Sequence, residues 1–248
     1  MTIVHKVREK TPLIHHLTNQ VVMNFTANGL LAYGGSPIMA KERQEVAEMA
    51  SISNGVLINI GTLVDTELEA MIIAGKSANE KGIPLVLDPV GVAATNFRKK
   101  ATEQLLDELS FTAIKGNAGE MAYLVDVAWE TKGVESSDGD VAELENIAGK
   151  IAKKYETIAI ITGETDVISD GETTKQNKTG HVMLTKITGA GCLLGSIVTA
   201  SIAVGDSALE ASYQAVEFYG AAAERAVKQA SVNGTGTFIP AFLDELQT

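Results

Sequence analysis

The sequence predicts an α/β protein with a mostly parallel β-sheet that is covered by helices on both faces. Short apolar runs rich in β-branched residues alternate along the chain with longer segments in which apolar residues recur at helical spacing. Near-continuous apolar strands are typical of a parallel sheet buried on both sides, and their alternation with helices indicates βαβ crossovers. With 248 residues, of which 45% are hydrophobic, we expect a single domain over 1–248.

The alternation is clearest between residues 56 and 161. The predicted strands lie at 56–60, 83–87, 111–115 and 158–161. The predicted helices between them lie at 66–81, 98–109, 117–125 and 141–155. A polar, acidic stretch at 131–140 is predicted to be a surface loop inside the domain.

The pattern changes after residue 165. Two short runs at 166–169 and 181–184 flank a polar segment at 171–180, which predicts a β-hairpin. The predicted helices in the rest of the chain lie at 191–204, 207–230 and 239–246, with a loop at 233–236. We therefore expect one antiparallel hairpin followed by a group of helices.

Composition argues against several classes of function. The 20 Lys and Arg residues against 31 Asp and Glu residues give a formal charge of −11, which disfavours nucleic acids and anionic membranes as partners. One cysteine cannot form an internal disulfide, which favours a reducing compartment. The N-terminus lacks the apolar run of a signal peptide, and the most apolar stretch, 192–204, is shorter than the ~20 residues of a membrane-spanning helix. We therefore expect a cytoplasmic protein.

Two features fail as ligand motifs. Residues 75–77 resemble the end of a phosphate-binding P-loop, but Ala70 stands where that motif has its first glycine. His15 and His16 are adjacent, so on a strand their side chains point to opposite faces and cannot bind one metal ion together.

The most informative segment is 186–192, where a Thr-Gly-Ala-Gly turn leads into a predicted helix. Glycines let backbone amides approach a ligand, and a helix N-terminus favours negative charge. Gly189, Ala190 and Gly191 would then form an anion hole for a transferring phosphoryl group. The same residues suit a small turn that packs a helix closely on a sheet, and spacing does not choose between the two.

Cys192 lies in the first turn of this helix. A free Cys is most often a small buried apolar residue, which is the interpretation that the position alone favours. In the alternative, the helix N-terminus lowers the pKa of the thiol and makes it a proton acceptor.

A second polar group lies where the strand at 111–115 gives way to a helix. Asn117 and Glu120 share a helical face, and their oxygens suit Mg²⁺. They also match a helix-capping pair, which the spacing alone favours.

Further polar residues end the predicted strands. Asp88, Lys115 and Thr162 lie at or next to the carboxyl ends of three strands, beyond which open α/β sheets bind ligands. Their shared placement with the Gly189 turn indicates a site for a nucleoside triphosphate.

Taken together, these residues resemble the hydroxyethylthiazole kinase family of the ribokinase-like superfamily. The resemblance covers nearly the whole chain and rests on the motifs at 16–19, 35–39, 87–91, 115–117 and 188–192. Most of the superfamily has an Asp as catalytic base after the Gly-Ala-Gly turn, whereas the thiazole kinases resemble this chain in having Cys. Cys192 is therefore the most specific marker of the resemblance.

The resemblance implies a three-layer α/β/α fold and a homotrimer with substrate sites between subunits. It implies an ATP- and Mg²⁺-dependent phosphotransferase. The implied substrate is a small molecule, 4-methyl-5-(2-hydroxyethyl)thiazole, phosphorylated at its primary hydroxyl in thiamine biosynthesis and salvage.

The resemblance also implies roles for individual residues. Cys192 is the implied base, and the amides of 189–192 hold the γ-phosphoryl group. The residues implied to order Mg²⁺ through water are Asp88 and Glu120. Those implied to serve the nucleotide are Lys115, Asn117 and Thr162. Those implied to line the thiazole pocket are Asn19, Met39, Gly61 and Gly189.

Two alternatives stay open from the sequence. Related folds phosphorylate hydroxymethylpyrimidine or sugars, or use ATP to dehydrate hydrated nicotinamide nucleotides, and an Asp would be expected at position 192 in those. A nucleotide- or thiazole-binding regulator without catalysis is the other alternative, and the missing Asp is its supporting feature.

Overall fold

The computed structural model describes residues 1–129 and 138–248, and an eight-stranded β-sheet runs through them. The strands are ordered β2-β1-β3-β4-β5-β6-β7-β8 across the sheet. Neighbours from β2 to β6 pair in parallel, whereas β7 and β8 pair antiparallel. The strands are β1 Leu13–Leu17, β2 Ser36–Ile38, β3 Gly55–Asn59, β4 Leu85–Asp88, β5 Ala113–Asn117, β6 Ile158–Thr162, β7 Asp166–Ser169 and β8 Thr174–Asn177.

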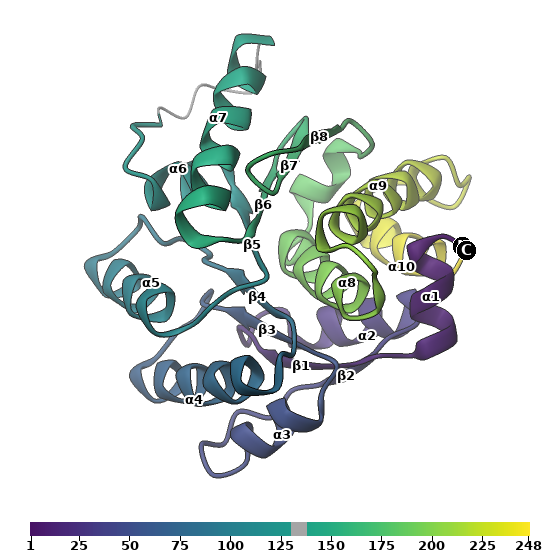
Figure 1. Ribbon diagram of the computed structural model, residues 1–248. Coiled ribbons are helices and arrows are strands. Elements are labelled where there is room, and N and C mark those ends of the chain that lie inside the picture. The colour runs from purple at the N-terminus through teal and green to yellow at the C-terminus, as the bar shows by residue number, and fades with distance from the viewer. Residues whose placement is uncertain (130–137) are drawn as a thin grey trace.

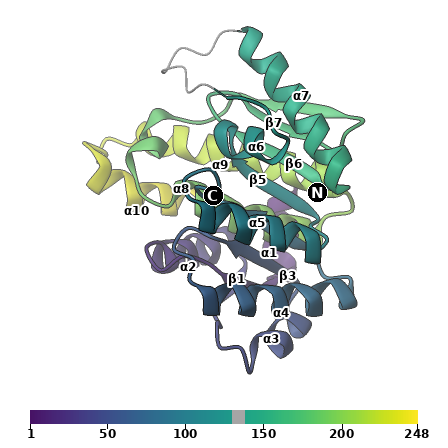
Figure 2. The ribbon, with the colours of Figure 1, turned by 90° about the vertical axis from the view of Figure 1, so that its left-hand side faces the viewer.

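Helices cover both faces of the sheet, as Figures 1 and 2 show. The layer on one face consists of α3 Val46–Ile52, α4 Asp65–Lys81, α5 Asn96–Glu108, α6 Ala118–Leu124 and α7 Asp138–Tyr155. The layer on the other face consists of α1 Ile3–Lys10, α2 Met23–Tyr33, α8 Ala190–Val204, α9 Ala208–Val227 and α10 Thr235–Glu245. The expected three-layer arrangement with a mostly parallel sheet is confirmed.

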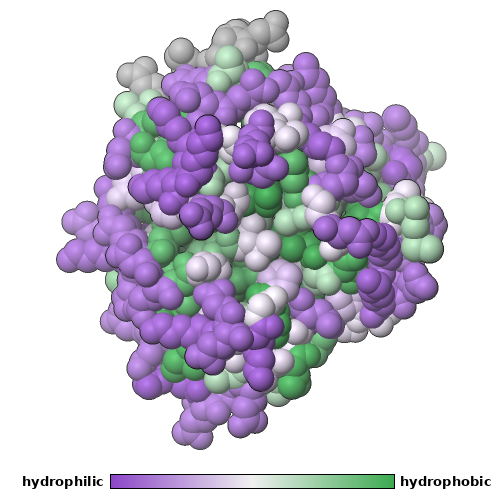
Figure 3. Space-filling model, viewed as in Figure 1, coloured by the Kyte–Doolittle hydropathy of each residue, from purple (hydrophilic) through white to green (hydrophobic). Residues whose placement is uncertain are grey.

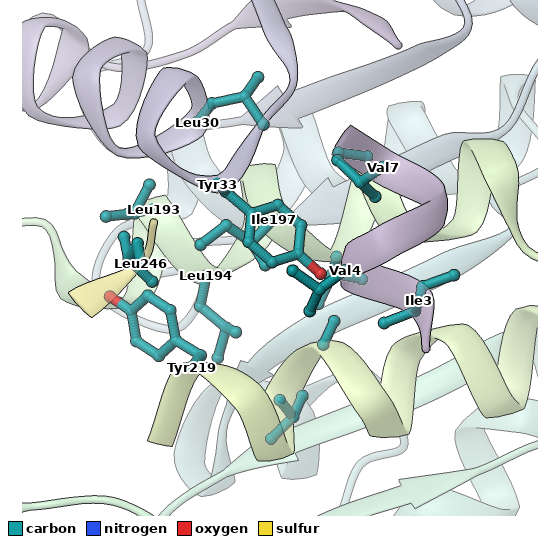
Figure 4. Packing of buried hydrophobic residues seen from close by; sticks show 14 of the residues in the cluster. Ile3, Val4, Val7, Leu30, Tyr33, Leu193, Leu194, Ile197, Tyr219 and Leu246 are labelled. Atoms are coloured by element: carbon teal, nitrogen blue, oxygen red, sulfur yellow. The ribbon is translucent and has the colours of Figure 1, made fainter. Parts of the chain in front are cut away.

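Helix α8 occupies the centre of the second layer. Nearly every residue from Leu193 to Val204 is buried, because the helix packs on β1, β3 and β4 and is covered by α1, α2 and α9. Figure 4 shows this packing, with Leu193, Leu194 and Ile197 of α8 among residues of α1, α2 and α9. A helix that is apolar all round is stable only in such surroundings. The core therefore fixes α8, and with it the turn at its N-terminus.

The predicted hairpin is present, but its second strand was predicted wrongly. Residues 174–177 pair with β7, whereas the predicted 181–184 are the N-cap residue His181 and the first three residues of a 3₁₀ helix at Val182–Lys186. The Asp170 carboxylate accepts hydrogen bonds from the amides of Glu172 and Thr173 and so closes a tight turn. β8 is an edge strand with a polar sequence. It therefore lacks the apolar pattern from which the other strands were predicted.

Three other points concern elements that were bounded differently, were not predicted, or lie outside the described residues. Helix α10 begins at Thr235, inside the predicted loop. The elements before residue 55, β1, β2 and α1 to α3, were not predicted. The predicted loop at 131–140 lies outside the described residues except for its last three, which begin α7.

The surface is largely hydrophilic on the face drawn in Figure 3, with apolar residues interspersed toward its centre. In the described ranges, no helix combines the length and apolar character needed to cross a membrane.

Candidate active site

Four polar side chains end neighbouring parallel strands at one edge of the sheet. Asn59 of β3 pairs in register with Asp88 of β4, and Asn117 of β5 pairs with Thr162 of β6. Parallel strands place their carboxyl ends at the same edge, where ligands of α/β proteins bind. The strand ends therefore form the floor of the candidate site.

The turn before α8 lies against this floor. Gly189 has a φ of +90°, and a Cβ there would lie 2.6 Å from Val22 Cγ1. Only glycine meets both conditions without strain. Gly189 is also the N-cap residue of α8, and no side chain caps it. The turn therefore depends on this glycine.

The first three amides of α8 have no partner in the described part of the chain. The first helical hydrogen bond runs from the Leu193 amide to the Gly189 carbonyl, at 2.9 Å. The amides of Ala190, Gly191 and Cys192 precede it and donate to no side chain or carbonyl. Such amides, with the helix dipole behind them, form an anion-binding site.

Two contacts hold this first turn in place from its carbonyl side. The Tyr219 hydroxyl donates to the Ala190 carbonyl at 2.7 Å, and Lys115 Nζ donates to the Gly191 carbonyl at 3.0 Å. The turn is thus fixed before any ligand arrives, as electrostatic stabilisation of a transition state requires.

Asn59 is the centre of a buried polar network. Its Oδ1 accepts from Asn19 Nδ2 at 2.9 Å and from the Gly61 amide at 3.0 Å. Its Nδ2 donates to Asp88 Oδ2 at 2.8 Å and to Cys192 Sγ at 3.3 Å. Asn59 thereby links the residue ending β4 to the first turn of α8.

Cys192 lies on this network rather than in packed hydrocarbon. Its half-buried side chain accepts hydrogen bonds from Asn59 and, at 3.4 Å, from Asn19. Burial and the nearby negative charge of Asp88 raise the pKa of the thiol above 9.0, and the donors around it offset this only in part. The alternative in which the helix N-terminus lowers the pKa of the thiol is therefore wrong, because burial and Asp88 raise it.

Asp88 and Lys115 form a buried ion pair. Lys115 Nζ lies 3.3 Å from Asp88 Oδ1, and their side chains are 5% and 1% exposed. Burial acts to lower the pKa of Lys115, but the charges of Asp88, Cys192 and Glu120 outweigh it and raise the pKa. Lys115 is therefore a permanent positive charge beneath the first turn of α8.

Asn117 and Glu120 form the helix-capping pair. The Asn117 side chain accepts from the Glu120 amide at 3.0 Å, and Glu120 Oε2 accepts from the Asn117 amide at 2.9 Å. Glu120 Oε1 accepts from the Gly91 amide at 2.8 Å, which ties the loop after β4 to α6. The pair therefore has a structural role, and the carboxylate stays partly exposed at the sheet edge.

The described residues contain no group of three or more His, Cys, Asp or Glu side chains that could hold a metal ion. Asp88 and Glu120 do supply carboxylate oxygens, the ligand type that Mg²⁺ prefers. Each oxygen already accepts one hydrogen bond and has a second lone pair for a metal-bound water. The donor set therefore fits Mg²⁺ ordered through water.

The residues assigned to the thiazole pocket are brought together only in part. Asn19 and Gly61 pack directly on each other, since a Cβ on Gly61 would lie 2.8 Å from Asn19 Nδ2. Met39 lies outside this network, in the segment after the edge strand β2. Thr162, assigned to the nucleotide, is half-buried and donates to the Gly116 carbonyl at 3.3 Å.

Sequence reasoning missed Asn59. It was treated as part of an apolar strand, although it is the one polar residue of the run at 56–60. The available signal was a polar residue at the carboxyl end of a buried strand. Asp88 has the same place in the next strand along the chain.

A cavity of about 460 Å³ borders the turn from another side. It is lined by α2, residues 186–188 and α10, and it shares Thr188 with the turn. Its volume is in the range of small-molecule sites.

Comparisons with known proteins agree with this geometry. Residues 4–248 match the model of the hydroxyethylthiazole kinase family. The chain is 55% identical over 245 residues to hydroxyethylthiazole kinase 1 of Oceanobacillus iheyensis, covering 98% of this chain and 94% of the relative.

Solved structures agree in fold. A hydroxyethylthiazole kinase protein from Pyrococcus horikoshii has a TM-score of 0.90 and 37% identity, with 99% of this chain and 91% of that chain covered. A ribokinase-like superfamily protein from Enterococcus faecalis has a TM-score of 0.66 at 13% identity, over 97% of this chain and 90% of that chain, and shares the fold. The chain therefore belongs to the hydroxyethylthiazole kinase family.

Proposed function

We propose that this protein transfers the γ-phosphoryl group of ATP to the primary hydroxyl of 4-methyl-5-(2-hydroxyethyl)thiazole, as a step of thiamine biosynthesis and salvage. The observation that carries the proposal is the set of amides of Ala190, Gly191 and Cys192 at the sheet edge, which have no partner among the residues that the structure describes. Family membership supplies the thiazole alcohol as the acceptor.

The amides act on the transferring group. Phosphoryl transfer has a loose transition state, so catalysis consists mainly of positioning and of neutralising charge on the phosphoryl oxygens. Amides held by Tyr219 and Lys115 need no rearrangement to accept that charge.

Lys115 can serve the nucleotide as well as the protein. An ammonium has three N–H donors, and Lys115 directs two of them at Asp88 and the Gly191 carbonyl. The third remains for a phosphate oxygen, and Asn117 and Thr162 flank the same edge.

Mg²⁺ fits beside Asp88 and Glu120, ordered through water. When bound, it neutralises negative charge on the phosphates. The two carboxylates would hold it through water, and their own positions are set by Asn59, Lys115 and the Gly91 amide.

In its thiolate form Cys192 can accept the proton of the hydroxyl late in the reaction, whereas the thiol form, which already carries a proton, cannot. Its raised pKa leaves little thiolate at neutral pH. This fits a reaction that makes little demand on a base, because proton loss follows formation of most of the new P–O bond. Cys192 therefore contributes less than the phosphoryl site.

Asn19 and Gly61 line the acceptor pocket, together with Met39 and Gly189. No hydrogen bond in the described part of the chain uses Asn19 Oδ1, so it can accept one from the primary hydroxyl. Met39 supplies a soft apolar surface for a sulfur heterocycle. We place the sites between the subunits of a cytoplasmic homotrimer, as the family resemblance implies.

The test is a coupled ADP-release assay with the thiazole alcohol and hydroxymethylpyrimidine in parallel, each with and without Mg²⁺. The proposal expects ADP release that requires the thiazole alcohol and the metal. Release with the pyrimidine alone would assign a related kinase activity. No release with either, despite nucleotide binding, would indicate a binding protein without catalysis.

A further inference from the structure

The two adjacent histidines of β1 form hydrogen bonds to two different elements beside the candidate site. His15 and His16 are both fully buried and point to opposite faces of the sheet. His15 faces the layer of α3 to α7, and His16 faces α8. Neither has a role in the phosphoryl transfer described above.

His15 holds the segment that follows the edge strand. Its Nε2 lies 2.7 Å from the Ala40 carbonyl, which can only accept, so Nε2 carries the proton. Burial lowers the pKa of His15 and keeps the ring neutral. The ring therefore provides a fixed neutral donor to the residue after Met39.

The segment at 39–41 has few other anchors. Met39, Ala40 and Lys41 make no backbone–backbone hydrogen bond within the described ranges. The ion pair of Lys41 with Glu67, at 3.1 Å, is one other tie, and Arg43 pairs with Glu69 on the exposed surface. The Lys41–Glu67 pair is largely buried, with side chains 20% and 15% exposed, but it holds the Lys41 side chain rather than the backbone of the segment. The exposed Arg43–Glu69 pair contributes little. Within the described ranges, the hydrogen bond from His15 is therefore the side-chain contact that holds the backbone next to Met39.

His16 braces a different element. Its Nε2 lies 2.7 Å from Ser196 Oγ on α8, one helical turn after Cys192. Its side chain therefore supports the helix that carries the phosphoryl site, and within the described ranges its ring makes no hydrogen bond to the segment at 39–41. The chain thus contains its own matched control, a neighbouring buried histidine with a different partner.

We propose that His15 is a positioning residue for the acceptor pocket, holding Met39 in place through the Ala40 carbonyl. The proposal rests on the proposed function, since Met39 is assigned there to the thiazole pocket. The proposal predicts that binding of the alcohol depends on the segment at 39–41, whereas binding of the nucleotide does not.

The test compares His15→Gln with His15→Asn. Both side chains are neutral amides, but only the longer one places its NH₂ group where Nε2 lies in histidine. We expect His15→Asn to raise KM and the Kd for the thiazole alcohol about tenfold, the value of one hydrogen bond. KM for ATP and kcat should stay within about twofold. His15→Gln should return the alcohol KM to near the wild-type value.

His16→Asn is the control. It should lower melting temperature or kcat and leave the KM for the alcohol within about twofold of wild type. The proposal is overturned if His15→Asn leaves the alcohol Kd unchanged, if it raises both KM values together, or if His15→Gln gives no recovery. Calorimetry with the alcohol alone provides the Kd without turnover. A wild-type protein that neither binds nor phosphorylates the alcohol would instead overturn the proposed function.

Discussion

The buried ion pair beneath the phosphoryl site can be tested by replacing Lys115 with Met. Methionine has an unbranched side chain like that of lysine, but it lacks the ammonium group. In the wild-type protein that group lies 3.3 Å from Asp88 Oδ1 and 3.0 Å from the Gly191 carbonyl. Because the Asp88 side chain is 1% exposed, water cannot replace the lost charge. Asp88 then loses the charge that opposes its burial, and burial already raises the pKa of this carboxyl, so keeping it ionised becomes still more costly.

The expected cost follows from that geometry. Two unit charges 3.3 Å apart attract by about 5 kcal/mol at an effective dielectric constant of about 20. Removing one partner of a buried pair generally costs about 3–5 kcal/mol. We therefore expect Lys115→Met to lower the free energy of unfolding by about 3–5 kcal/mol.

Urea unfolding of the nucleotide-free protein at pH 7 measures this loss. The double variant Lys115→Met with Asp88→Asn should recover most of it, because a neutral amide at position 88 no longer needs an opposite charge. If the single variant loses less than about 1 kcal/mol, Lys115 has no structural role and only contacts the nucleotide. That result would refute the ion pair as the support of the first turn of α8.

Three further predictions concern other parts of the site. Gly189→Ala should lower kcat strongly in the ADP-release assay because the new methyl meets Val22 and the positive φ is strained, whereas Gly149→Ala, in open space on a helix, should leave kcat unchanged. Cys192→Ala should retain measurable kcat and Glu120→Gln should lose more; abolition by Cys192→Ala alone, with nucleotide binding intact, would reverse that ranking. Burial lowers the pKa of His16 from 6.5 to about 4. The unfolded chain therefore takes up a proton that the folded chain does not, and the free energy of unfolding should fall by roughly 3 kcal/mol as the pH is lowered from 6.5 to 4. The loss begins below pH 6.5 and is complete near pH 4, and a parallel series of urea curves on His16→Gln should show a weaker dependence.

The sequence was sufficient for the layers and for β3 to β6 of the parallel part of the sheet. The apolar strands of the central region and the helices between them have the strong periodicity that predicts buried elements. Polar edge strands lack it, which is why residues 174–177 were missed. The elements before residue 55 were also missed, since β2 has only three residues and α3 only seven.

The candidate site was predictable as a set of strand ends but not as a network. Asp88 and Lys115 were identified separately, and only the register of β4 and β5 shows that they neutralise each other. The raised pKa of Cys192 depends on burial and on Asp88, which the helix N-terminus alone does not reveal. Asn59 was overlooked because its hydrogen bonds connect residues that are distant in sequence.

The most direct test of the central claim is the amide resonance of Cys192. The chain contains one cysteine, so labelling with ¹⁵N-cysteine gives a single backbone signal at the proposed phosphoryl site. With Mg²⁺ and a non-transferable ATP analogue, we expect a downfield shift of that signal, and a much smaller shift with ADP, which lacks the γ-phosphoryl group. An unchanged signal at saturating analogue would contradict the account, because the amides of α8 would then not hold the group being transferred.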